Sequence, residues 1–124
     1  MITVAQRLAA AQRLLDGKVT DADGVWARAV VWILRVALEQ QVDEVWQRAS
    51  VPDMQAASMR AQLIVLRTVA GDVAADRAAL LWHSLSHAAH HHDYELAPAV
   101  VELVRWQAEA TEVVRLLRAG APIR

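Results

Sequence analysis

The chain has 124 residues, of which 56% are hydrophobic and 22% charged, and its formal net charge is −1. This length and hydrophobic content indicate one domain, residues 1–124, with a single core, and they exclude an intrinsically disordered chain. The near-neutral charge excludes a global field that attracts nucleic acid or anionic membrane, and the absence of cysteine excludes disulfides and thiolate metal sites.

All the predicted elements are helices, because strand-like alternation and hairpin turns of the Asn-Gly type are missing. The first helix covers residues 2–16 and ends at Gly17. It has an apolar residue at every turn, at Val4, Leu8, Ala11 and Leu15. Thr20 and Asp23 then resemble a capping box, which predicts a second, long helix over residues 21–49.

Proline and glycine separate the remaining helices. The sequence Ser-Val-Pro-Asp at 50–53 ends the second helix and begins a third, which runs to about Val69. A fourth helix covers residues 72–92 and a fifth covers residues 98–118, because Pro98 disfavours helical geometry in the residue before it. These lengths and short connections predict an all-α, up-and-down bundle of four to five helices.

The second helix is apolar nearly all the way round over residues 25–38, VWARAVVWILRVAL. Two interpretations remain open: a central helix of a five-helix monomer, or a helix shared with a second subunit. Four long helices cannot easily surround one of their own members, so we favour a homodimer with symmetric pairing. The five tryptophans of the chain are expected in the core or in an interface.

No segment resembles a membrane anchor or a signal peptide. The N-terminal stretch MITVAQRLAAAQRLLDG carries three charged side chains and lacks the apolar centre of a signal peptide. The longest apolar tract contains Arg28 and Arg35 and is too short to span a bilayer. We therefore expect a soluble, cytoplasmic protein with no membrane partner.

Residues 85–98, LSHAAHHHDYELAP, hold most of the groups that titrate near neutral pH. Four of the five histidines lie between His87 and His92, and the only tyrosine is Tyr94. One helical turn separates His83 from His87, and His87 from His91, so either pair could bind a metal ion.

A metal site would need a further ligand from another helix, because a single helix supplies only two neighbouring ligands. Glu39, Asp43 and Glu102 are the candidates for it. Neither HExxH nor the paired Glu-x-x-His of di-metal bundles occurs. For Glu39, a local ion pair with Arg35 one turn earlier is favoured over a buried acid that orients a histidine. The histidine run is more typical of a solvated helix end than of a metal site.

The tripeptide His92-Asp93-Tyr94 favours acid–base chemistry on RNA. An imidazole titrates near neutral pH and can move protons to and from a ribose hydroxyl or a leaving oxygen. A phenol can hydrogen-bond the phosphate or hold the histidine in place. Metal-independent cleavage of RNA needs little else besides positive charge near the phosphate, which a local arginine patch could supply.

This tripeptide resembles the motif of the HEPN superfamily, small all-helical bacterial proteins that include RNA-cleaving toxins and defence effectors. The family motif is Arg, four to six residues, then His, followed in the toxin branch by any residue and Tyr. Here His87 stands four intervening residues before His92, where the family has arginine. A second register, Arg77 and then His83 after five residues, fits the looser motif but lacks the tyrosine.

The departure at His87 matters because histidine lacks the permanent charge and the rigid fork of a guanidinium group. It implies either an imperfect substitute for arginine or a site that has lost catalysis. Two further segments, ALEQQVDEVWQRAS at 37–50 and SMRAQLIVLRTV at 58–69, are similar to the body of small actinobacterial HEPN-like proteins. The resemblance therefore extends over most of the chain.

The resemblance implies a HEPN-like bundle that dimerises, with the active groups facing each other across a cleft, RNA as substrate, and no metal or organic cofactor. His92 would be the general acid or base, Tyr94 would contact the phosphate or orient the histidine, and His87 would take the electrophilic position. The secondary candidates are Arg77, His83, His91 and Glu39. A nucleotidyltransferase or antitoxin from a neighbouring gene is the implied protein partner in a toxin–antitoxin or defence system. The alternative is a non-catalytic dimeric interaction module or scaffold subunit.

Overall fold

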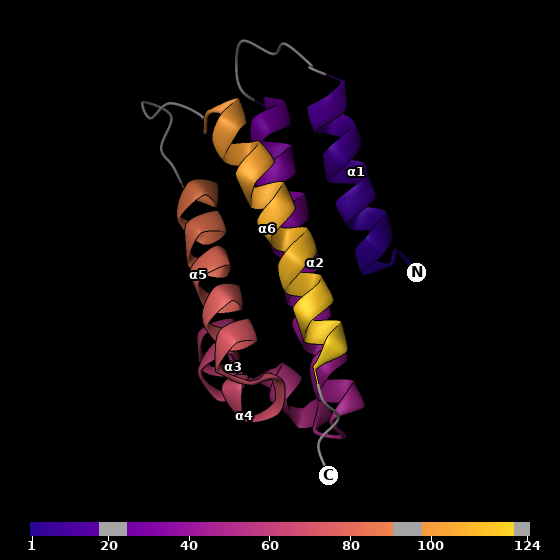
Figure 1. Ribbon diagram of the computed structural model, residues 1–124, viewed down its shortest axis with the longest axis vertical. Coiled ribbons are helices and arrows are strands. Elements are labelled where there is room, and N and C mark those ends of the chain that lie inside the picture. Colours follow the sequence, from indigo (N-terminus) through magenta and orange to yellow (C-terminus); the bar gives the residue numbers. More distant parts are fainter. Residues whose placement is uncertain (18–24, 91–97, 121–124) are drawn as a thin grey trace.

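The computed structural model describes residues 1–17, 25–90 and 98–120, and the described part contains helices and no strand. Four long helices stand side by side in up-down-up-down order (Figure 1). They are α1 (Val4–Asp16), α2 (Val25–Arg48), α5 (Asp72–Ala89) and α6 (Val100–Ala119). Three short elements connect α2 to α5, namely the 3-10 helix η1 (Pro52–Ala56), α3 (Met59–Val65) and α4 (Arg67–Ala70). The predicted all-α, up-and-down bundle is confirmed.

Helix α1 forms as the sequence predicts. The Thr3 hydroxyl accepts the backbone N–H of Gln6, and the Gln6 side chain accepts the backbone N–H of Thr3, which makes a capping box. The helix ends at Gly17. Of the predicted apolar stripe, three members are buried and Leu8 packs against the core at its edge.

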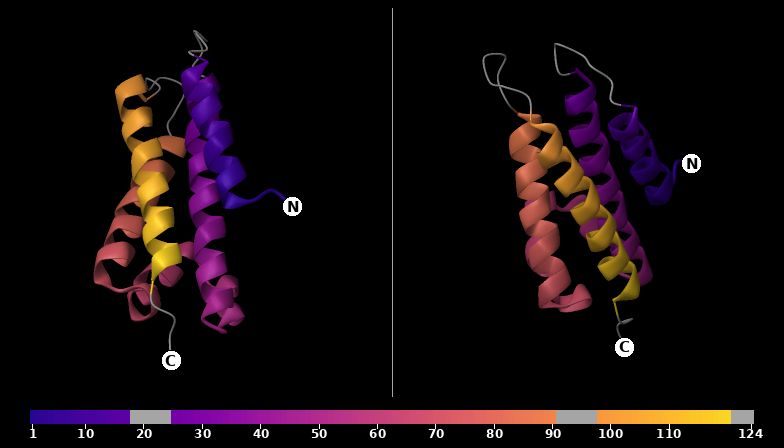
Figure 2. Two further views of the ribbon diagram at one scale, coloured as in Figure 1. Left: turned by 45° about the vertical axis from the view of Figure 1, so that its right-hand side comes forward. Right: turned by 45° about the horizontal axis from the view of Figure 1, so that its top comes forward.

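Helix α2 occupies the centre of the bundle. It packs against α1, α5 and α6, while α1 and α5 lie on opposite flanks (Figures 1 and 2). A single chain therefore covers three sides of its most apolar helix, which accounts for much of the hydrophobicity seen in the sequence. The remaining side carries Val25 and Trp32, whose exposed fractions are 56% and 58%.

The prediction of one continuous third helix up to Val69 is wrong, because three short elements occupy that region. The Ser58 hydroxyl accepts the N–H of Ala61 and begins α3 after an extended Ala57. Further along, the Thr68 hydroxyl donates to the Val65 carbonyl at 2.8 Å, and this side-chain bond competes with the helical ladder where α3 gives way to α4.

Helices α5 and α6 agree with the prediction in position and differ slightly in their ends. Helix α5 begins after Gly71, whose φ of 85° is a conformation that glycine adopts without strain. It ends at Ala89, with His90 as its C-cap, and α6 begins two residues later than predicted. The capping box predicted at Thr20 and Asp23, and the helix end predicted at His92, lie outside the described residues.

Polar side chains tie the short elements and the end of α6 to α2. The indole N–H of Trp46, 1% exposed, donates to Gln62 Oε1 at 2.9 Å. Gln62 Nε2 donates in turn to the Ala57 carbonyl at 2.8 Å. Arg48 donates to the carbonyls of Leu117 and Arg118 at 2.6 and 3.1 Å and thereby caps the end of α6. These bonds fix the register of the helices at this end of the bundle.

Candidate functional site

The described histidines share the outward face of α5. His83, His87 and His90 are all exposed, and Asp76 lies on the same face of the helix. His87 is in the last turn of α5, and its carbonyl accepts the backbone N–H of His90 at 3.2 Å. Water therefore reaches three imidazoles along one helix face, at the end of α5 that leads into residues 91–97. We call these four residues the histidine face.

Three of the predicted site residues, His91, His92 and Tyr94, lie outside the described residues. Their roles as acid or base and as phosphate contact therefore stay predictions. Among the predicted residues that the structure describes, His87 is the nearest to them in the chain, and it is exposed.

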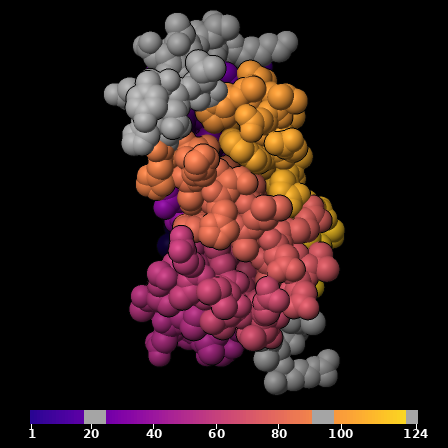
Figure 3. All heavy atoms as spheres, turned by 90° about the vertical axis from the view of Figure 1, so that its left-hand side faces the viewer, coloured from indigo at the N-terminus to yellow at the C-terminus, as the bar shows by residue number. Residues whose placement is uncertain are grey.

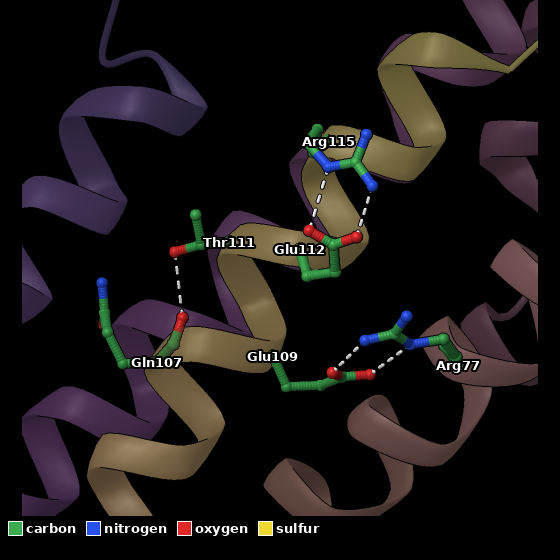
Figure 4. A network of polar contacts seen from close by, with 6 residues as sticks. All are labelled: Arg77, Gln107, Glu109, Thr111, Glu112 and Arg115. Carbon is green, nitrogen blue, oxygen red and sulfur yellow. Dashed lines mark hydrogen bonds and ion pairs between the residues drawn. The ribbon is translucent and has the colours of Figure 1, made fainter.

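Arg77, the arginine of the second register, is held in an ion pair with α6 (Figure 4). Its Nε donates to Glu109 Oε2 at 2.9 Å and its Nη2 donates to Glu109 Oε1 at 2.5 Å. The hydrogen bond to Glu109 raises the pKa of Arg77, and the charges of Glu109 and Glu112 add to the rise against a smaller opposing effect of burial. Arg77 thus points toward α6 while His83 faces solvent, so the two residues of this register do not come together.

Glu39 lies where α2 meets α5 and accepts two hydrogen bonds through one oxygen, Oε2. Arg35 Nε donates to it at 3.1 Å and the indole N–H of Trp82 donates at 2.9 Å. The predicted ion pair between Glu39 and Arg35 is confirmed. The Arg35 guanidinium also lies 5.7 Å from the centre of the Trp82 ring, a cation–π distance.

This cluster brings Glu39 and His83 near each other through Trp82. The His83 ring meets the Trp82 ring edge-on, with 5.4 Å between centroids and an angle of 71°. Burial, and then the charge of Glu39, raise the pKa of Asp43 one turn further along α2. Glu39 thus positions the indole of Trp82, and among the described residues its hydrogen bonds come from Arg35 and Trp82 and not from an imidazole.

Two of the three candidates for a further metal ligand are engaged elsewhere. Glu39 is bonded to Arg35 and Trp82, and Glu102 lies 4.0 Å from Arg105 on its own helix. Over residues 1–17, 25–90 and 98–120, no three side chains of the ligand types His, Cys, Asp and Glu are grouped so that they could hold a metal ion.

Sequence reasoning missed a cavity between α5 and α6. Its volume is about 320 Å³, and it is lined by Leu80, Leu81, Ser84, Arg105, Trp106 and Glu109. Exposed apolar side chains stand beside it, with exposed fractions of 71% for Leu80 and 74% for Val101. The signal that could have revealed it is the apolar residue at an outward position of each helix, next to an arginine on α6.

The tryptophans were predicted in the core or in an interface. Trp46 is buried, and three others pack at the edge of the core, at Trp26, Trp82 and Trp106. Trp32 is the exception, because more than half of it is exposed on the open side of α2.

Comparison with known proteins adds no assignment. The chain matches no family model, no curated protein and no solved structure. None of the helices in the described part is both long and apolar enough to cross a membrane.

Proposed function

We propose that this chain is a HEPN-type, metal-independent endoribonuclease of a toxin or defence system, with its active groups at the C-terminal end of α5 and in the residues that follow. The observation that carries the proposal is the exposure of His87 in the last turn of α5, five residues before His92. Imidazoles that water reaches can exchange protons with a ribose hydroxyl and with a leaving oxygen. His92 acts as general acid or base, and Tyr94 contacts the phosphate.

His87 takes the place that arginine has in the family motif. Arg77 is a poor substitute for that arginine, because its Nε and Nη2 already donate hydrogen bonds to Glu109. A histidine lacks the permanent charge and the rigid fork of a guanidinium group. The enzyme is therefore weaker than relatives with arginine.

The open side of α2 supports the proposal of a homodimer. Val25 and Trp32 form an exposed apolar stripe on this side. Two copies of α2 that pair antiparallel about a two-fold axis would cover both Trp32 indoles. The dimer would place the C-terminal ends of both copies of α5, which carry the active groups, in one assembly.

The same stripe supports a second candidate function, a non-catalytic interaction module or scaffold subunit. In that case the surface around Trp32 would dock a protein from a neighbouring gene, such as a nucleotidyltransferase or an antitoxin. This candidate differs from the first in requiring no chemistry from the histidines.

Cleavage of total RNA or tRNA in the presence of EDTA tests the first candidate. We expect wild type to cut, His92→Ala and Tyr94→Phe to lose at least about a hundredfold, as general acid–base groups do, and His87→Arg to gain activity. His90→Ala is the matched control, because it removes an imidazole from the same face without an assigned role. Equal activity in all variants, or none in wild type and His87→Arg, would contradict the proposal and favour the scaffold.

Sedimentation of Trp32→Glu separates the dimer from the chemistry. The substitution places a charge in the stripe and should convert dimer to monomer, whereas Glu44→Gln on an exposed part of the same helix should leave the dimer intact. Wild-type protein that sediments as a monomer would exclude the homodimer.

A further inference from the structure

The cavity between α5 and α6 has the character of a small amphiphile site. Its apolar surfaces come from Leu80 and Leu81 of α5 and from the Trp106 indole of α6. Figure 3 shows the face of the molecule on which α5 runs beside α6. A volume of about 320 Å³ is at the lower end of the range of small-molecule sites, which fits a short aliphatic chain.

The charges around the cavity decide which head group it accepts. Glu109 is neutralised, because both of its oxygens accept hydrogen bonds from Arg77. Glu112 is neutralised in the same way by Arg115 one turn further along α6 (Figure 4). The acidic groups next to the cavity therefore offer little attraction to a cationic ligand.

Arg105 is the one basic residue among those that line this cavity. Its Nη2 forms a long ion pair with Glu102 on the same helix, at 4.0 Å, and its side chain is 72% exposed, so most of the guanidinium group can still reach a ligand. A guanidinium group presents a fork of N–H donors that matches a carboxylate with two hydrogen bonds. The Ser84 hydroxyl lines the same cavity and supplies one more donor.

We infer that this cavity binds a short aliphatic carboxylate, with the alkyl chain against Leu80, Leu81 and Trp106 and the carboxylate on Arg105 and Ser84. Burial of the chain supplies affinity, and the guanidinium selects the anionic head group. No residue of the histidine face lines this cavity, so the inference does not depend on the proposed RNA chemistry.

Titration with three ligands of equal chain length tests the head-group preference. Octanoate, octyltrimethylammonium and octanol are added below their micellar or solubility limits. Binding is followed by the indole N–H resonance of Trp106, which is assigned with Trp106→Phe. We expect octanoate to shift this resonance at lower concentration than octanol and the cationic ligand to leave it unchanged. No shift with octanoate, or equal shifts with the cationic ligand, would overturn the inference.

Two pairs of matched variants locate the ligand. Arg105→Gln should weaken octanoate about tenfold, the loss expected when a hydrogen bond to a charged group disappears. Arg60→Gln, exposed on α3 and outside the cavity lining, should leave the affinity unchanged. Likewise Leu80→Ser should weaken binding severalfold, whereas Val73→Ser, two turns earlier on α5 and 68% exposed, should not. Equal losses within either pair would show that octanoate binds elsewhere, which contradicts the site.

Discussion

The buried contact between α2 and α3 and the histidine face of α5 use polar side chains in opposite ways. At the buried contact, Trp46 and Gln62 are 1% and 3% exposed, and each has its hydrogen bond. On the histidine face, His83, His87 and His90 are exposed to water. Stability and candidate chemistry therefore reside in different parts of the molecule. Substitutions should be able to separate the two.

The largest loss of stability should come from Gln62→Leu. The change leaves the buried indole N–H of Trp46 without an acceptor and removes the donor to the Ala57 carbonyl, which should cost about 2 to 3 kcal/mol. Urea unfolding followed by tryptophan fluorescence measures it.

A matched control is Gln107→Leu on α6, which also replaces a buried glutamine by a side chain of similar size. Gln107 Oε1 is buried without a hydrogen-bond partner among the described residues, so its removal relieves an unfavourable group. The Leu8 carbonyl that Gln107 bonds lies within α1, where the helical ladder can still satisfy it. We expect a cost below about 1 kcal/mol, and equal costs for the two variants would contradict the importance of the Trp46 bond.

A smaller loss is expected from Arg48→Met at the end of the bundle. Arg48 places its charge and two hydrogen bonds on the last carbonyls of α6, at Leu117 and Arg118. Methionine keeps the aliphatic part of the side chain, so the expected loss of about 1 kcal/mol reports the cap alone. The exposed Arg60→Met is the control, and hydrogen exchange in the last turn of α6 should speed up only in the Arg48 variant.

Asp43 should make stability depend on pH in the direction opposite to a paired carboxylate. Its pKa is raised from 3.8, first by burial and then by Glu39, so ionisation opposes folding. The penalty is absent below pH 3.8, where Asp43 is protonated in both states, and appears as pH rises through the raised pKa. Asp43→Asn should thus stabilise the protein at pH 7 by at most about 0.5 kcal/mol, since solvent screens the group.

Unfolding curves at pH 3 and pH 7 check this sign. The gain from Asp43→Asn should vanish at the lower pH, and it should shrink at pH 7 when Glu39→Gln is already present. Glu44→Gln, an exposed neighbour on α2, controls for a general effect of charge. A gain that grows toward acid would contradict the raised pKa.

The parts of the fold that sequence predicts are those that depend on periodicity and local capping. The stripe of α1 and its stop at Gly17 are of this kind, as is the start of α5 after Gly71. Ser58 and Thr68 broke the predicted third helix, because a single hydroxyl bond can outweigh helical propensity over a few residues. The ion pair of Glu39 could also be predicted, because its partner Arg35 is one helical turn away in the sequence.

Hydrogen bonds between residues of different helices could not be predicted from the sequence. The partner of Arg77 is Glu109, 32 residues away, and the second hydrogen bond of Glu39 comes from Trp82, 43 residues away. Both depend on how α5 sits against its neighbours, which no local pattern encodes. The consequence for the site is direct: the Arg77 register looked plausible as spacing along one helix, and the ion pair across helices turns it away from His83.

The smallest effects on stability should come from substitutions on the histidine face. This face is therefore the strictest test of whether stability and candidate chemistry reside in different residues. His87→Ala and His90→Ala should each change the free energy of unfolding by less than about 0.5 kcal/mol, because substitutions of exposed side chains usually have small effects. His83→Ala should cost the most of the three, since its ring contacts Trp82 edge-on. RNA cleavage should show another order, with His87→Ala losing activity and His90→Ala keeping it. If activity followed stability across the three variants, the exposed imidazoles would be acting through the fold, and the proposed chemistry at the end of α5 would lose its basis.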